Sequence, residues 1–463
     1  MVFRSLFLAF LCAASSGFAQ SVEFTPEEAR EVAIAAVNAG DFETAHQLSD
    51  VLLQRNAKDV SALIVRARVA IALGDFEDAE TLAGSAFSLS SNEHARFAAA
   101  RVVALAHANQ NEFTRAQFWL RRARQVAPDA EARALAAQDF RIVAARNPLS
   151  VSFSFGISPS NNVNNGSSNS RVVAPDWANF LKSFLGSSAV VGDVVDLSAG
   201  SQAIKGFNIQ AGLSLGYTLG QTPTSRTTLT FGASANQVVF TAAEKAANPT
   251  IDPRAYSTQS LSFGLDRVWA ADDGGYYAIS PEVSQVWYGG SILQQSLALD
   301  AKRFWAIDER NGFTLLPRYE LTRYPASSDQ SQTFGVSAQW QHVLETGGRL
   351  GFDVTTSKVS AKDPLKASFG GGISVSYSHP APVFGFDISG TVGQSWRRFE
   401  GWNGGAGTRS DATFNIGLDV AAPKAEIYGF VPVMSLSGSA TQSDRDLYDK
   451  TVTSIGLNFR SAF

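Results

Sequence analysis

The chain has 463 residues, far more than one hydrophobic core organises, so at least two domains are expected. Charged residues make up 17% and hydrophobic residues 45% of the sequence, which excludes a disordered chain and a helical membrane protein. The formal net charge is −4 and no block of basic residues occurs, so nucleic acid is not an expected partner.

Residues 1–19 have the pattern of a secretory signal peptide. Arg4 supplies the positive charge, an apolar run follows, and Ala19 ends a small-x-small cleavage site. The one cysteine, Cys12, lies inside this leader, where the bulky Leu11 disfavours lipid attachment. We therefore expect an exported protein whose mature part has no disulfides or cysteine-bound metals. No later stretch approaches the roughly 20 apolar residues that a spanning helix needs.

The composition changes at Pro148. The preceding part is rich in alanine and contains no tyrosine, whereas all 10 tyrosines and all but four of the 38 glycines follow this proline. Alanine favours helices, and aromatic residues with glycine favour strands and turns. The sequence therefore predicts a helical domain over residues 20–147 and a β domain over residues 148–463.

A short motif repeats within the helical part. Residues 40–45 (GDFETA) return as residues 74–79 (GDFEDA), 34 residues later, and more weakly as residues 111–116. This period is typical of tetratricopeptide repeats, in which paired helices stack and offer a concave surface to peptides. Pro128 closes the third copy at the expected place, and a generic helical bundle is the alternative. Small residues should let the paired helices approach closely: Ala33, Ala36, Ala67 and Ala70.

Strict alternation of apolar and small polar residues dominates the rest of the chain, as in residues 149–157 and 206–218. A soluble β-sandwich also alternates, but its strands are shorter and its inward face forms a packed core. Here the segments have about ten to thirteen residues, and glycine and serine fill the second face, as a watery lumen requires. The sequence therefore predicts a transmembrane β-barrel.

The alternating segments number about fourteen, and bacterial barrels have even strand numbers. Twelve or sixteen strands are also compatible, because strand ends are uncertain by several residues. The connections between these segments alternate along the chain: every second connection is short, and most of the others are long. The connection at residues 289–291 is an exception, because it is short where a long one is expected. The expected strands are 149–157, 206–218, 226–239, 257–269, 276–288, 292–304, 312–324, 332–344, 348–359, 368–379, 384–398, 409–420, 425–440 and 451–463.

Aromatic residues lie near the ends of these segments, where membrane barrels carry interfacial girdles. They include Tyr217, Trp269, Trp287, Trp305 and Trp396. The last segment resembles the signal that the barrel-assembly machinery recognises, with alternating apolar residues before a terminal aromatic residue. The residues that form it are Ile455, Leu457, Phe459 and Phe463, whereas Ser461 departs from the pattern.

No motif for catalysis is present. The five histidines fall in different segments without metal-ligand spacing, and no nucleophile elbow or phosphate-binding loop occurs. We expect no enzymatic activity, cofactor or metal. By strand parity, six ionisable side chains should point into the lumen: Asp266, Glu282, Asp300, Lys302, Arg318 and Glu320. They suit a polar path or plug contact, although ordinary pairing between lumen side chains explains them as well.

The order of leader, short repeat array and fourteen-stranded barrel resembles the surface lipoprotein assembly modulators. The barrel entry from Asn147 adds to this resemblance, because the first strand is followed by proline and then by the triplet Asn162-Val163-Asn164. The resemblance implies a translocon of type XI secretion, which carries surface lipoproteins or secreted proteins across the outer membrane. It also implies an outer-membrane location with the N-terminal domain in the periplasm.

Two other functions are compatible with the sequence, namely an exopolysaccharide export porin and a general diffusion porin. Polysaccharide exporters also join periplasmic repeats to a barrel, although their arrays are usually longer and their lumens more charged or aromatic. For the translocon, the expected partners are a client protein, outer-membrane lipid and the barrel-assembly machinery, and the expected state is a monomer.

Overall fold

The computed structural model describes residues 24–173, 194–403 and 407–461. The chain forms two compact units that divide after Ala144, close to the predicted boundary at Asn147. The predicted leader and Phe463 lie outside the described residues. Within the described residues, no helix is both long and apolar enough to cross a membrane.

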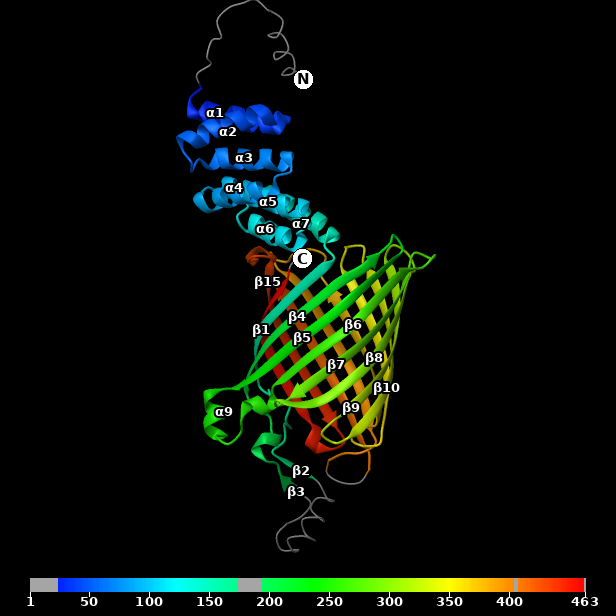
Figure 1. Ribbon diagram of the computed structural model, residues 1–463. Helices are drawn as coiled ribbons and strands as arrows, with labels where there is room; N and C mark the ends of the chain where they lie inside the picture. Colours follow the sequence, from blue (N-terminus) through cyan, green and yellow to red (C-terminus); the bar gives the residue numbers. More distant parts are fainter. Residues whose placement is uncertain (1–23, 174–193, 404–406, 462–463) are drawn as a thin grey trace, which may run out of the picture. The chain divides into compact units, whose positions relative to one another are not determined.

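The N-terminal unit consists of helices in repeated pairs, as the 34-residue period predicts (Figure 1). The helices are α1 (Pro26–Ala39), α2 (Phe42–Arg55), α3 (Val60–Leu73), α4 (Phe76–Leu89), α5 (Glu93–Asn109), α6 (Phe113–Gln125) and α7 (Ala130–Arg146). Three pairs follow the motif, α1 with α2, α3 with α4 and α5 with α6, and one further helix ends the array.

The repeated motif forms the turn within each pair. Gly40 and Gly74 end α1 and α3 with a φ of 82°, which costs glycine little and other residues more. The next residue, Asp41 or Asp75, then caps the following helix by accepting a backbone N–H bond of 3.1 Å. In the third copy Asn111 adopts the left-handed conformation instead, with a φ of 61°. The predicted role of the motif is confirmed.

Small residues allow close packing of the helices. The side chains of Ala33, Ala36, Ala67 and Ala70 are all buried, as predicted. Between the second and third pairs, Phe87 and Trp119 form an edge-to-face contact with ring centroids 5.4 Å apart.

The C-terminal unit is a closed antiparallel barrel of 14 strands, each paired with its neighbours in sequence order (Figure 1). Strands β1 and β16 close it, with Phe155 opposite Phe459 and Ile157 opposite Leu457. The barrel strands are β1 (Leu149–Ser160), β4 (Gly206–Gln221), β5 (Ser225–Phe240), β6 (Thr258–Ala270), β7 (Tyr276–Tyr288), β8 (Ser291–Ala306), β9 (Asn311–Tyr324), β10 (Asp329–Val343), β11 (Arg349–Ala361), β12 (Ser368–Ser378), β13 (Asp387–Phe399), β14 (Arg409–Ala421), β15 (Phe430–Ser443) and β16 (Lys450–Ser461).

Side-chain exposure distinguishes the two faces of the barrel wall. Residues at alternate positions of each strand form two sets, which we call phases. Large apolar residues of one phase are about half exposed, as for Phe155 at 52% and Ile416 at 52%. Small polar residues of the other phase are buried despite their size, as for Ser296 at 8% and Thr322 at 6%. Side chains spread apart on the convex side of a curved wall and crowd on the concave side. The apolar phase therefore faces outward and the polar phase faces the lumen.

We call the end where β1 begins and β16 ends the terminal rim, and the opposite end the loop rim. Outward-facing aromatic pairs mark the terminal rim: Trp269 with Tyr277, Trp305 with Phe313, and Trp340 with Phe352. Their ring centroids lie 5.6, 5.6 and 5.2 Å apart. An apolar outer band flanked by aromatic residues is the property of barrels that span membranes.

Two features of the connections differ from the prediction. At the terminal rim, the turn expected at residues 421–424 is longer and covers residues 422–429. Ile427 and Tyr428 lie in this turn, although the sequence pattern assigns them to the following strand. At the loop rim, the connection after β1 carries elements of its own, β2 (Arg171–Val173), β3 (Val194–Asp196) and η1 (Ala199–Ser201). The next loop contains α9 (Ala242–Ala247) and η2 (Pro253–Tyr256). Two other connections contain a short helical turn: η3 (Pro423–Ala425) lies between β14 and β15, and η4 (Asp446–Tyr448) lies between β15 and β16.

Candidate functional site

Strands β6 to β9 place all six of the predicted ionisable residues on the lumen face. Cross-strand partners share a face, and Asp300 lies opposite Arg318. Their neighbours in sequence, Leu299 and Tyr319, are 47% and 42% exposed on the outward face. Four carboxylates and two cations give this part of the lumen wall a net negative charge.

Arg318 is the centre of the main cluster. Its guanidinium donates to Asp300 at 2.6 Å and to Glu320 at 2.9 Å. Glu320 also accepts a bond of 3.1 Å from Thr322, whose hydroxyl lies 3.1 Å from that of Ser296. The sequence brings these groups together because Arg318, Glu320 and Thr322 alternate on one strand and their partners lie on the next.

The other three predicted residues stand outside this cluster. Asp266 accepts a bond of 2.6 Å from the hydroxyl of Ser280. The Lys302 ammonium lies 5.4 Å from the centroid of the Tyr276 ring, near the terminal rim. Within the described residues, Glu282 makes neither a hydrogen bond nor an ion pair, so its carboxylate is available to a passing molecule.

The opposite part of the lumen wall is lined mainly by hydroxyls and glycines. A depression of about 450 Å³ there is bordered by Ser374, Ser395 and Ser437, among others. Acidic residues on this wall are paired with serines, since Ser337 donates to Asp353 at 2.8 Å and Ser435 to Asp419 at 2.6 Å. This wall offers weak hydrogen-bonding groups and few uncompensated charges.

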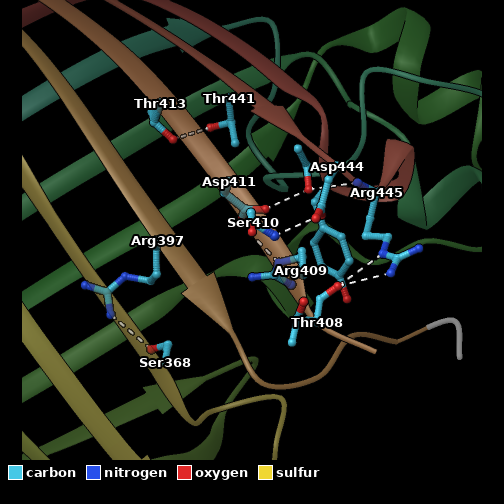
Figure 2. Close-up of polar contacts among 12 residues, drawn as sticks. Ser368, Arg397, Thr408, Arg409, Ser410, Asp411, Thr413, Thr441, Asp444 and Arg445 are labelled. Carbon is cyan, nitrogen blue, oxygen red and sulfur yellow. Dashed lines mark hydrogen bonds and ion pairs between the residues drawn. The ribbon is translucent and has the colours of Figure 1, made fainter. Parts of the chain in front are cut away.

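Cations and aromatic rings gather at the lumen side of the loop rim, and Figure 2 shows Arg409 and Asp411 among the polar side chains there. The Arg409 guanidinium carbon lies 3.7 Å from each of the ring centroids of Phe399 and Tyr448. Arg409 also forms an ion pair of 3.1 Å with Asp411, which accepts a bond of 2.7 Å from Ser443. The sequence analysis did not single out these residues, because the contact partners lie on separate strands and loops.

The triplet Asn162-Val163-Asn164 fixes the first loop. Asn164 donates to the carbonyls of Gly200 at 3.0 Å and Gln202 at 2.7 Å, and accepts from the Ile204 N–H at 2.9 Å. Asn162 exchanges two bonds of 2.8 and 2.9 Å with the Gly166 backbone. The role seen for the triplet is to hold the loop closed on itself.

Val163 adds an apolar contact to this arrangement. It packs in a buried cluster with Ile204, Val238 and Phe240, so the loop is attached to strand β5. We call these triplet contacts the loop clamp.

The first helices of the repeats and the final helix α7 form a continuous surface in the N-terminal unit, because α1 lies beside α3, α3 lies beside α5, and Arg101 of α5 pairs with Asp139 of α7. We call this the first-helix face. Polar bonds cross it, from Arg68 to Asn38 at 2.9 Å and from Arg101 to Asp139 at 2.8 Å. Burial and the nearby positive charge of Arg101 lower the pKa of Arg68, whose hydrogen-bond partner is an amide and not a carboxylate.

Apolar side chains lie beside these polar groups. Ile34, Leu105 and Ile142 are 41%, 50% and 55% exposed. Ile34 and Leu105 follow Arg30 and Arg101 by four residues, so each apolar side chain lies on the same side of its helix as an arginine. Arg30 is paired with Glu27 and Asp59, and Arg101 with Asp139, so this surface suits an extended or helical peptide mainly through its exposed apolar side chains.

No protein-family model and no curated protein sequence matches the chain. Among solved structures, the yeast Sti1 TPR2B domain in complex with an Hsp70 peptide is 19% identical, covers 26% of this chain and 98% of its own, and has a TM-score of 0.24. The Yersinia enterocolitica type III secretion translocator chaperone SycD is 18% identical, with coverages of 28% and 94% and a TM-score of 0.24.

A bacterial polysaccharide outer membrane secretin is 9% identical to this chain, covers 67% of it and 98% of its own length, and has a TM-score of 0.33. An outer membrane channel from Pseudomonas putida F1 is 10% identical, with coverages of 67% and 95% and a TM-score of 0.32. These similarities are too low to bear on function.

Proposed function

We propose that this protein is an outer-membrane translocon or assembly modulator that delivers surface lipoproteins or secreted proteins to the cell surface. The proposal rests mainly on one observation: a surface suited to binding peptides and a polar-lined transmembrane barrel belong to one chain. Tethering keeps a captured client at a high effective concentration near the barrel. No chemical step, nucleotide or cofactor takes part in the proposed function.

The proposal includes an orientation. The repeats precede β1, and an even strand number returns the C-terminus to the same side, so we place both in the periplasm. Epitopes inserted near Asn165 or Asn403 should be labelled on intact cells, and an epitope near Asp75 should not. Surface labelling at Asp75 would contradict this orientation.

The main test separates capture from conduction. Replacing the exposed apolar residues of the first-helix face (Ile34→Ser, Leu105→Ser and Ile142→Ser) should reduce client display as much as deleting residues 21–146 does. The matched control replaces exposed apolar residues of the second helices, Val51, Leu89 and Phe118, which are 62%, 45% and 56% exposed. The readout is the surface and secreted proteome, measured by mass spectrometry after labelling intact cells.

Normal client display by the barrel alone, or an equal loss in the control variant, would contradict the proposal. An unchanged proteome after deletion of the gene, together with loss of surface polysaccharide, would favour the glycan exporter. The lumen aromatic residues of the described strands lie near strand ends, as for Tyr276 and Phe399, so they do not form a continuous platform for sugars along the bore.

A further inference from the structure

Four basic residues interrupt the outward face of the barrel near the loop rim. They are Arg323 on β9, Lys358 on β11, Lys362 just after β11, and Arg398 on β13, and we call them the basic patch. All four side chains are exposed. Within the part of the chain that the structure describes, none of them makes a hydrogen bond, an ion pair or a ring contact.

Their outward direction follows from the register. Lys358 lies opposite Phe334 on one side and Phe369 on the other, and Phe369 lies opposite Arg398. Phe334 and Phe369 are 55% and 57% exposed, so they belong to the apolar outer face. Arg323 follows the outward-facing Leu321 by two residues and therefore shares its face.

The spacing brings these charges into one region of the surface. Lys358 and Arg398 stand two strands apart, which corresponds to about 10 Å. Arg323 lies opposite Gln330 of β10, and Lys362 follows Ala361, which ends β11 opposite Ser331 of β10, so both cations border the same groove. On β13, Trp396 precedes Arg398 and is 51% exposed, so the charge follows directly after the aromatic border of the apolar band.

A groove of about 980 Å³ runs along this surface from β5 to β11. One edge is apolar and includes Phe263, Leu297 and Leu321. The edge nearer the loop rim is polar or basic and includes Gln285, Gln295, Gln330, Arg323 and Lys362. The groove therefore offers apolar contact on one side and cations on the other, as an amphipathic ligand requires.

The acidic residues near the basic patch do not neutralise its positive charges. Asp329 and Asp363 both bind Lys366, at 3.0 and 2.6 Å. Glu400 lies two residues beyond Arg398 and forms no ion pair with it among the described residues. An unpaired cation on the lipid face of a barrel is costly at the midplane and tolerated near the interface, where anionic headgroups can neutralise it.

We propose that the basic patch binds the phosphate groups of a lipid headgroup, with the acyl chains of that lipid lying on the groove and the adjacent apolar band. The occupant is a glycolipid carrying two phosphates, since the patch holds several cations at a spacing of about 10 Å and opens onto the membrane. This inference rests on the membrane location in the proposed function, and it does not depend on what passes through the barrel.

The test uses the purified full chain in dodecyl maltoside micelles and fluorescent bisphosphorylated lipid A as the probe. The patch variant carries Arg323→Gln, Lys358→Gln and Arg398→Gln. The matched control removes three exposed cations near the terminal rim, through Arg226→Gln, Arg267→Gln and Lys424→Gln. Heat-modifiable migration on gels shows that each variant is folded, and Lys358→Gln alone serves if the triple variant does not fold.

We expect the patch variant to bind the probe about a hundredfold more weakly, because each basic residue beside an anionic lipid contributes about fivefold. For the single variant, a fivefold loss is expected. The control should bind like the wild type, and millimolar inorganic phosphate or phosphatidylcholine should not displace the probe. Unchanged binding by the patch variant, an equal loss in the control, or displacement by inorganic phosphate would each overturn the proposal. Client display by the patch variant is measured separately, so failure here is distinct from failure of the proposed function.

Discussion

The loop clamp gives a prediction whose size follows from the structure. Asn164 is 8% exposed and makes three bonds to backbone groups of Gly200, Gln202 and Ile204. A typical bond of this kind contributes about 1 kcal/mol, and its loss leaves a buried backbone group without a partner. Asn164→Ala should therefore lower the free energy of opening this loop by about 3 kcal/mol.

The expected effect is local, because the ladder of the barrel does not depend on this side chain. Hydrogen–deuterium exchange in micelles should show protection of the Ile204 amide falling by about a hundredfold, since 1.4 kcal/mol corresponds to a factor of ten. Asn403→Ala is the matched control, because this exposed residue lies in a neighbouring loop and bonds to Tyr448 only through its backbone N–H. Unchanged protection in Asn164→Ala, or an equal loss in the control, would refute the reasoning.

Four further predictions concern other parts of the chain. Ala67 is fully buried, so Ala67→Leu should destabilise the helical unit by about 1–3 kcal/mol in thermal melts followed by circular dichroism of the full chain. Removing Phe463 should reduce the amount of heat-modifiable barrel in the membrane, whereas unchanged amounts would show that the terminal strand is not an assembly signal. In the loop after β11, the hydrogen bond from Lys366 lowers the pKa of Asp363. The stability that it contributes is present above the unfolded pKa of about 3.9 and is lost as the pH falls through the lower folded value. The protection of residues 362–367, measured relative to the intrinsic exchange rate at each pH, should therefore fall in acid, and this dependence should be weaker in Lys366→Ala, where the backbone bond from Leu365 remains. Arg318→Met makes the lumen wall more negative, so planar-bilayer recordings should show increased preference for cations over anions.

Most of the fold follows from local patterns in the sequence. The alternation of apolar and polar residues can be recognised from neighbouring residues alone. It predicts the fourteen strands, and it predicts that Arg318 and its partners face the lumen. The repeated turn likewise follows from Gly40 and Asp41, because a left-handed glycine and a capping aspartate act on the adjacent helix ends. Helix α7 was not singled out, since no copy of this turn precedes it.

The sequence predicts the contacts between distant segments poorly. Asn164 binds Gly200 and Gln202, more than thirty residues away, and nothing local in either segment indicates this pairing. The turn at residues 422–429 continues the apolar pattern of its strand, so alternation places its end too early. The basic patch could have been recognised in the sequence, because Lys358 and Arg398 occupy strand positions where the alternating pattern predicts apolar residues.

The asymmetry of the lumen bears on which cargo the barrel suits. A molecule that crosses a pore must bind well enough to enter and weakly enough to leave. Arg318 is held by Asp300 and Glu320, so its charge is partly compensated before any cargo arrives. The facing wall of serine and glycine offers single weak hydrogen bonds, which an extended polypeptide can exchange at each step. In the proposed function, strong binding of the client is therefore confined to the first-helix face. A cargo that binds tightly in the lumen would require a wall with more unpaired charges or aromatic side chains than this one.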